Sequence, residues 1–173
     1  MTYAAVSSIM CDRKIAEEWL PRIFSPEYDP RFILPEQKRG VTLGMRMTEK
    51  QGGSDLRSNT TTATPIAGRE YQVVGHKWFF SALMSDAFLI LAQAPPGLSC
   101  FFLPRFTPEG EVNDIRIQRL KDKLGDRSNA GSEVLSRRVF STKGEAYGCR
   151  SQDQEGIVGR VAGRARCQVG VRA

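Results

Sequence analysis

The chain has 173 residues, of which 40% are hydrophobic and 25% charged, and its formal net charge is +6. This composition is typical of a globular protein and excludes an intrinsically disordered one. No apolar run approaches the roughly 18 to 20 residues that a membrane-spanning helix needs, and the first residues lack the pattern of a secretory signal. We therefore expect an intracellular protein, cytoplasmic or mitochondrial, without a membrane span.

Cysteine and histidine are too sparse and too scattered to predict a metal site. The cysteines are far apart and form no CxxC pair: Cys11, Cys100, Cys149 and Cys167. His76 is the single histidine, which excludes a mechanism that needs two. We predict reduced thiols and no metal.

Residues 1–40 combine short helical patterns with prolines. Apolar side chains recur there at roughly helical spacing, interrupted by Pro21: Ile15, Trp19, Leu20 and Phe24. We interpret this segment as the remnant of an N-terminal helical domain.

The pattern changes at Val41, after which short apolar segments alternate with Gly and Pro turns. VTLGMRMTE predicts one strand, and REYQVVGHKWFFS predicts two strands that meet at a turn near Val74-Gly75-His76. Further strands are predicted from AFLILAQA, LSCFFLPRF, IRIQRLKDKLG and GSEVL. Such short strands favour a mainly β fold, an antiparallel barrel or sandwich, which we place at residues 41–157.

The pattern weakens after about Val134. The stretch LSRRV interrupts the expected strand, and the following residues are rich in Gly and Arg, so we expect a poorly ordered basic tail at 158–173. Much of the net positive charge lies in this part of the chain. A basic tail can bind nucleic acid or an anionic membrane.

Three segments could carry chemistry. In Met45–Asp55 (MRMTEKQGGSD), the Gly52-Gly53 pair lets backbone amides approach an anion, and Thr48 and Ser54 add hydroxyl groups. A plain surface turn is the alternative. This segment is neither a P-loop nor a dinucleotide-binding motif.

The second segment, Gly75–Ser81 (GHKWFFS), contains three adjacent aromatic residues, which cannot all face one side of a strand. At least one of them should meet a neighbour or a flat ligand, although a core strand is the alternative. The third segment, Arg119–Ala130 (RLKDKLGDRSNA), has charges of alternating sign, which are also typical of a solvated loop.

Together, MTEKQGGSD, GHKWFFS, LSCFFLPRF and RLKDKLGDRSNA resemble the acyl-CoA dehydrogenase family, and within it the adaptive-alkylation-response (AidB-type) branch. The resemblance extends from about Met1 to Val134. It implies the family's middle β domain, which in that family lies between an N-terminal helical domain and a C-terminal four-helix bundle.

The resemblance also implies FAD as cofactor. Thr48 would hydrogen-bond the flavin ring and Ser54 the pyrophosphate, while Ser81 would lie near flavin N5. Trp78 and Phe79 would lie beside the isoalloxazine, with Phe80 adjoining. The implied cofactor-binding residues are Met45, Arg46, Met47, Thr48, Glu49, Lys50, Gln51, Gly52, Gly53, Ser54, Trp78, Phe79, Phe80 and Ser81.

One feature of the family has no counterpart here. Its catalytic base is a glutamate in the C-terminal bundle, and no residue of this sequence maps onto it, so we assign no catalytic residue. We expect an FAD-binding flavoprotein of the type that oxidises CH–CH groups of an acyl-CoA-like substrate, present as an incomplete, catalytically deficient fragment. Full-length relatives form homo-oligomers. The alternative is a non-catalytic, DNA-associated alkylation-response protein.

Overall fold

Two α-helices and seven β-strands make up the computed structural model, which describes residues 1–52, 55–95 and 97–143. The helices are α1 (Thr2–Ile9) and α2 (Arg13–Ile23), and two short 3-10 helices follow at η1 (Pro35–Gln37) and η2 (Leu56–Ser58). The strands are β1 (Leu43–Arg46), β2 (Thr62–Ala67), β3 (Glu70–Ser81), β4 (Ala87–Ala94), β5 (Gly97–Pro104), β6 (Ile115–Leu120) and β7 (Gly131–Lys143).

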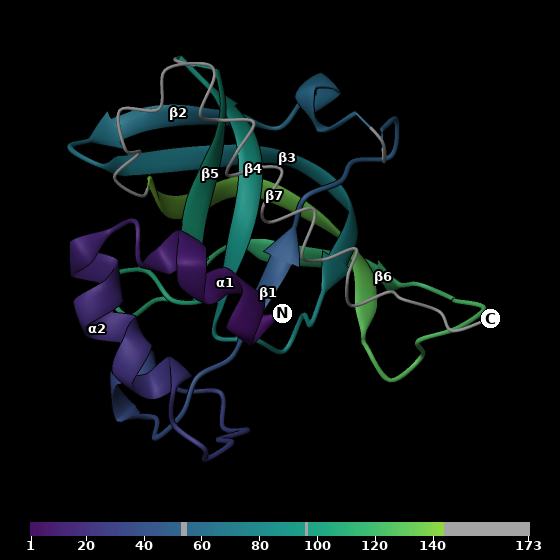
Figure 1. Ribbon diagram of the computed structural model, residues 1–173. Helices are drawn as coiled ribbons and strands as arrows, with labels where there is room; N and C mark the ends of the chain where they lie inside the picture. Colours follow the sequence, from purple (N-terminus) through teal and green to yellow (C-terminus); the bar gives the residue numbers. More distant parts are fainter. Residues whose placement is uncertain (53–54, 96, 144–173) are drawn as a thin grey trace.

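The strands close on themselves into a barrel-like sheet. β3 pairs with β7, β7 with β5, β5 with β4, and β4 with β1, whose other edge returns to β3. β2 lies between β3 and β4, and β6 extends the sheet beyond β7 (Figure 1). The predicted mainly β fold is confirmed, but the sheet is mixed, because β1 and β2 run parallel to β4.

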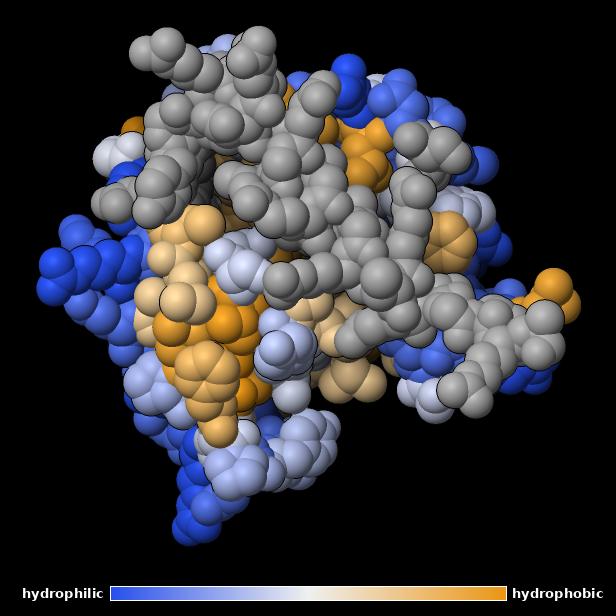
Figure 2. Space-filling view, in the orientation of Figure 1, coloured by the Kyte–Doolittle hydropathy of each residue, from blue (hydrophilic) through white to orange (hydrophobic). Residues whose placement is uncertain are grey.

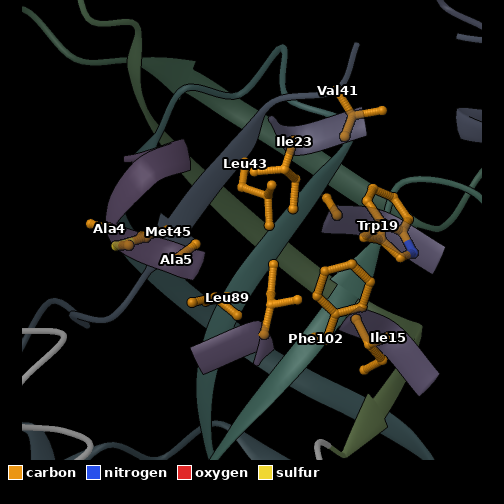
Figure 3. Close-up of a cluster of buried hydrophobic side chains, with 12 residues drawn as sticks. Ala4, Ala5, Ile15, Trp19, Ile23, Val41, Leu43, Met45, Leu89 and Phe102 are labelled. Atoms are coloured by element: carbon orange, nitrogen blue, oxygen red, sulfur yellow. The ribbon is translucent and has the colours of Figure 1, made fainter. Parts of the chain in front are cut away.

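The two helices pack on the outside of the barrel, against β1, β4 and β5 (Figure 1). Asp12 begins α2 by accepting a hydrogen bond from the backbone N–H of Ile15, and the apolar stripe Ile15, Trp19 and Ile23 then faces the sheet. Trp19 meets Phe102 edge-on, with ring centroids 4.8 Å apart (Figure 3). This helix–sheet core holds α1 and α2 against the barrel.

Strand β4 is apolar from Ala87 to Ala92, where it is buried on both faces. Ala87 and Leu89 point into the helix–sheet core, whereas Phe88 and Ile90 point into the barrel interior. The interior is filled by one buried cluster: Ala63, Val73, Phe80, Phe88, Ile90, Ala92, Phe101, Leu103 and Val134.

Three details of the predicted elements are wrong. Pro21 lies inside the last part of α2 and does not end it. The turn predicted near Gly75 is absent, because β3 continues through it with a register shift between Val73 and Gly75. β7 likewise continues through LSRRV to Lys143, where pairing with β3 compensates for the weak apolar pattern. The predicted tail at 158–173 lies outside the described residues.

The helix-bearing side of the molecule displays hydrophobic residues over α1, bordered by hydrophilic residues along α2 (Figure 2). Tyr3 and Met10 are among the exposed hydrophobic residues of this part of the chain.

Within the described ranges, no helix is long and apolar enough to cross a membrane.

Candidate functional site

A β-bulge in β3 determines which of its aromatic side chains face outward. Lys77 lies opposite Val134 and Phe80 opposite Ser132, so β3 has one residue more than β7 between these pairs. Lys77 and Phe80 are therefore both buried, while Phe79 is 48% exposed. Trp78 is half-buried. The sequence TrpPhePhe thus contributes two rings to an outer surface and one to the core.

The loop that follows β1 lies directly against this aromatic surface. Met45 on β1 is the pairing partner of Ser81 on β3. The backbone N–H of Trp78 donates a hydrogen bond of 3.1 Å to the carbonyl of Thr48. Two segments that are about thirty positions apart in the sequence are therefore held side by side by backbone contacts.

A buried ion pair holds the same two segments together. The Glu49 carboxylate and the Lys77 ammonium are 2.8 Å apart. Both backbone N–H groups and both hydroxyls of Thr60 and Thr61 also donate to this carboxylate, as does Gln51. Glu49 thereby connects the start of the loop, its end and strand β3.

The environment of this pair shifts both pKa values. Burial alone would raise the pKa of Glu49, but hydrogen bonds from Lys77, Thr61 and Thr60 outweigh it and hold the pKa well below its usual value. Burial lowers the pKa of Lys77 to about 8, against the opposing effect of Glu49. The carboxylate is therefore ionised at neutral pH, and it organises the loop rather than serving as a proton donor.

Cationic side chains surround the Trp78 ring. The ammonium nitrogen of Lys121 lies 2.8 Å from the ring centroid, and Lys50 and Arg119 approach to 5.5 and 5.3 Å. Glu133 accepts from Arg119 at 2.7 Å and lies 2.8 Å from a ring nitrogen of His76. Hydrogen bonding to Arg119 contributes most to lowering the pKa of Glu133. The surroundings of the ring thus favour a flat ligand that carries negative charge.

The side chains of the predicted cofactor-binding residues do not all face this surface. Arg46 and Phe80 point into the barrel, Met45 lies in the helix–sheet core and Met47 packs against it. Glu49 is enclosed by its partners. The residues that retain accessible side chains are Thr48, Lys50, Gln51, Trp78, Phe79 and Ser81. Gly52 is half-buried, and Gly53 and Ser54 lie outside the described residues.

Sequence reasoning did not identify Arg119 and Lys121 as part of the surface around Trp78, because they were considered only as part of a charged loop. Pairing of β6 with β7 brings them to the same side as Trp78. The same segment, Lys121 included, lines a hollow of about 230 Å³ between Leu120 and Gly131. There, the ammonium group of Lys123 donates to the carbonyls of Asp126 and Asn129, so its charge stabilises the loop itself.

Comparison with known proteins identifies the β domain. The family model described as acyl-CoA dehydrogenase, middle domain, matches residues 44–139. Over 118 residues the chain is 57% identical to AidB of Escherichia coli (strain K12), a match that covers 68% of this chain and 22% of AidB.

Solved structures agree with this match. The crystal structure of Caenorhabditis elegans ACDH-11 in complex with C11-CoA has a TM-score of 0.74 and 28% identity, and the match covers 92% of this chain and 28% of that one. Glutaryl-CoA dehydrogenase from Mycobacterium smegmatis in complex with FADH2 shares the fold at a TM-score of 0.60 and 20% identity, covering 82% of this chain and 31% of that one. The chain therefore spans less than a third of the length of each of these relatives.

Proposed function

The chain belongs to the acyl-CoA dehydrogenase family, and from this we propose that its β-barrel binds FAD as the middle domain of a flavoprotein that oxidises CH–CH bonds. The observation that carries the proposal is the joined surface of the loop after β1 and the bulged end of β3. There, Trp78 and Phe79 face outward, and Thr48 lies beside them through its hydrogen bond to Trp78.

This surface has the properties that an isoalloxazine ring requires. Phe79 offers an exposed flat apolar face that can stack on a ring and exclude water, and Trp78 lies next to it with the Lys121 ammonium over one face of its ring. Thr48 and Ser81 are partly exposed, and we propose that their hydroxyls hydrogen-bond the ring. Lys50, beside Trp78, adds positive charge that favours an anionic cofactor.

Burial restricts the roles that we propose for some of the implied cofactor-binding residues. Because the side chains of Arg46, Glu49 and Phe80 are buried, we propose that these residues contribute to the site through their backbone and by fixing its shape. When bound, FAD would supply the hydride acceptor, and the residues of this chain would orient its ring and shield one face from water. The proposed pyrophosphate contact of Ser54 lies outside the described residues.

The substrate of the whole protein is proposed from its relatives. ACDH-11 was crystallised with C11-CoA, which supports an acyl-CoA-like substrate. By family resemblance the catalytic base belongs to a C-terminal helical bundle, and homo-oligomers are formed by full-length relatives. We therefore propose flavin binding as the activity of this chain, and substrate oxidation as an activity of the whole protein. The alternative of DNA association depends on the basic tail, which lies outside the described residues.

The proposal is tested by the visible absorption spectrum of the purified chain after incubation with FAD and removal of free cofactor. We expect a retained flavin band whose shape differs from that of free FAD, because the ring enters an apolar environment. A folded chain, verified by circular dichroism, that emerges colourless even from saturating FAD contradicts the proposal.

A further inference from the structure

The ammonium group of Lys121 covers one face of the Trp78 ring. Its nitrogen lies 2.8 Å from the ring centroid, whereas the Lys50 nitrogen and the Arg119 guanidinium carbon lie 5.5 and 5.3 Å from it. The Lys121 side chain is 9% exposed, and a cation–π contact is stronger when the cation is shielded from water. A flat ligand can therefore meet Trp78 only at the other face or at the edge of its ring.

The positive charge of Lys121 is only partly compensated. Its partner Glu133 lies 3.5 Å from the Lys121 nitrogen and also accepts a hydrogen bond of 2.7 Å from Arg119. One carboxylate is thus shared by two cations, and Lys50 brings a third positive charge to the ring. Burial and the neighbouring positive charges lower the pKa of Lys121, and Glu133 offsets them only in part. A negative charge beside Trp78 would reduce this excess of positive charge.

An isoalloxazine ring acquires such a charge when it is reduced. The neutral oxidised ring takes up two electrons and one proton, which together make it an anion. A positive charge that is shielded from water binds the anion more tightly than the neutral ring. By thermodynamic linkage, a protein that binds the reduced form more tightly raises the reduction potential of the bound cofactor.

We propose that Lys121 is a positioning residue of the flavin site, which acts through Trp78 and makes the protein bind reduced FAD more tightly than oxidised FAD. This inference rests on the proposed flavin function. It assigns to a residue that follows β6 an effect on the reduction potential of the cofactor. A role in stability alone would change the binding of both forms equally and would leave the potential of the bound cofactor unchanged.

The test measures the reduction potential of FAD bound to the full chain, by anaerobic reduction beside a reference dye. Lys121→Met removes the charge and should weaken the preference for reduced FAD about tenfold, which lowers the potential of a two-electron couple by about 30 mV. Lys121→Arg retains the charge and should keep the potential near that of the wild type. Lys14→Met, which removes an exposed lysine of α2, should leave the potential unchanged.

Glu133→Gln tests the proposal in the opposite direction. It removes the negative charge beside Lys121 and should therefore raise the potential. Loss of packing does not predict opposite shifts from two changes in the same contact. If Lys121→Met retains no FAD, Glu133→Gln decides alone, and a potential equal to or below that of the wild type contradicts the proposal. Loss of FAD from both variants would assign the contact a structural role and would contradict the proposal too.

The failure of this inference differs from that of the proposed function. Equal potentials of the wild type and Lys121→Met overturn the inference and leave flavin binding intact. A folded wild type without a retained flavin band overturns the proposed function, and the role of Lys121 with it. The absorption spectrum separates these two cases before any potential is measured.

Discussion

Glu49 and Lys77 form an ion pair in which the carboxylate and the ammonium nitrogen lie 2.8 Å apart and the two side chains are 2% and 1% exposed. Glu49 follows Thr48 in the sequence, and Lys77 precedes Trp78. A second contact joins these neighbours, because the N–H of Trp78 donates a hydrogen bond to the carbonyl of Thr48. The pair therefore fixes the loop after β1 relative to the outward-facing aromatic residues of β3. It shapes the candidate site without facing it.

Replacing Glu49 with Gln should destabilise the fold strongly. The change keeps the size of the side chain but leaves the buried ammonium of Lys77 without a countercharge, which costs about 3–5 kcal/mol. Urea unfolding followed by circular dichroism measures the loss. The control is Glu17→Gln, which removes the exposed pair with Arg13 and should change stability little. Equal losses in the two variants would contradict a special role for the buried pair.

The same carboxylate should make the fold sensitive to acid. The pKa of Glu49 is lower in the folded state than the ordinary value of 4.5. Between these two pKa values the unfolded chain binds more protons than the folded chain, so the free energy of unfolding rises with pH. The contribution of Glu49 is thus complete above about pH 4.5 and is lost as the pH falls towards its folded pKa.

The loss of stability at low pH is measured relative to the double variant Glu49→Gln/Lys77→Met, which carries neither charge. The stability of the wild type relative to the double variant should decrease as the pH falls from 5 to 3. Urea unfolding at each pH measures this difference. A difference that stays constant over the interval would show that Glu49 has an ordinary pKa.

The strongest apolar patterns predicted the fold well. AFLILAQA and LSCFFLPRF became β4 and β5, because a strand buried on both faces must be apolar at nearly every position. β2 was missed, since Thr62–Ala67 is mostly exposed and contains Pro65, so neither alternation nor hydrophobicity marks it. β2 pairs with β3 across the two-residue turn Gly68-Arg69, and the only local signal of this hairpin is a glycine with positive φ.

The candidate site was predicted at the level of segments but not of side chains. The glycine at position 75 suggested a turn, but the structure gives another reason for it: a Cβ there would lie 2.4 Å from the hydroxyl oxygen of Thr61. The Glu49–Lys77 pair was also missed, although a lysine inside an aromatic strand was an available signal. The bulge that turns Phe80 inward depends on the register with β7, which the local sequence does not specify.

Gly44→Ala should disturb the junction between β1 and β3. A Cβ at this position would lie 2.5 Å from the carbonyl oxygen of Ser81 and 2.7 Å from the Phe88 ring. A backbone oxygen cannot move aside as a flexible side chain can, so we expect a loss of about 1–3 kcal/mol. Urea unfolding measures it against Gly125→Ala, where the added methyl meets nothing within 4 Å. Similar stabilities of the two variants would contradict this packing argument.

Cys100 should be unreactive in the folded protein. Burial, with a smaller contribution from Cys11, raises its pKa to about 12, and the thiolate is the reactive form. We expect alkylation by iodoacetamide at pH 8 to be at least about a hundredfold slower than in concentrated urea. Peptide mass spectrometry follows Cys100 separately from the other cysteines. Equal rates in the two conditions would show that the thiol is accessible.

Removing the outward-facing aromatic rings should weaken FAD binding without a matching loss of stability. Trp78→Leu removes the ring that lies beside Thr48, and loss of stacking should lower FAD affinity by about tenfold or more. Phe24→Leu, which removes an exposed aromatic ring on the C-terminal end of α2, should leave the affinity unchanged. Titration of FAD followed by flavin fluorescence gives both dissociation constants, and urea unfolding identifies any general destabilisation. If both variants bind FAD like the wild type, the flavin does not lie on the Trp78 surface, and any retained cofactor occupies another part of the barrel.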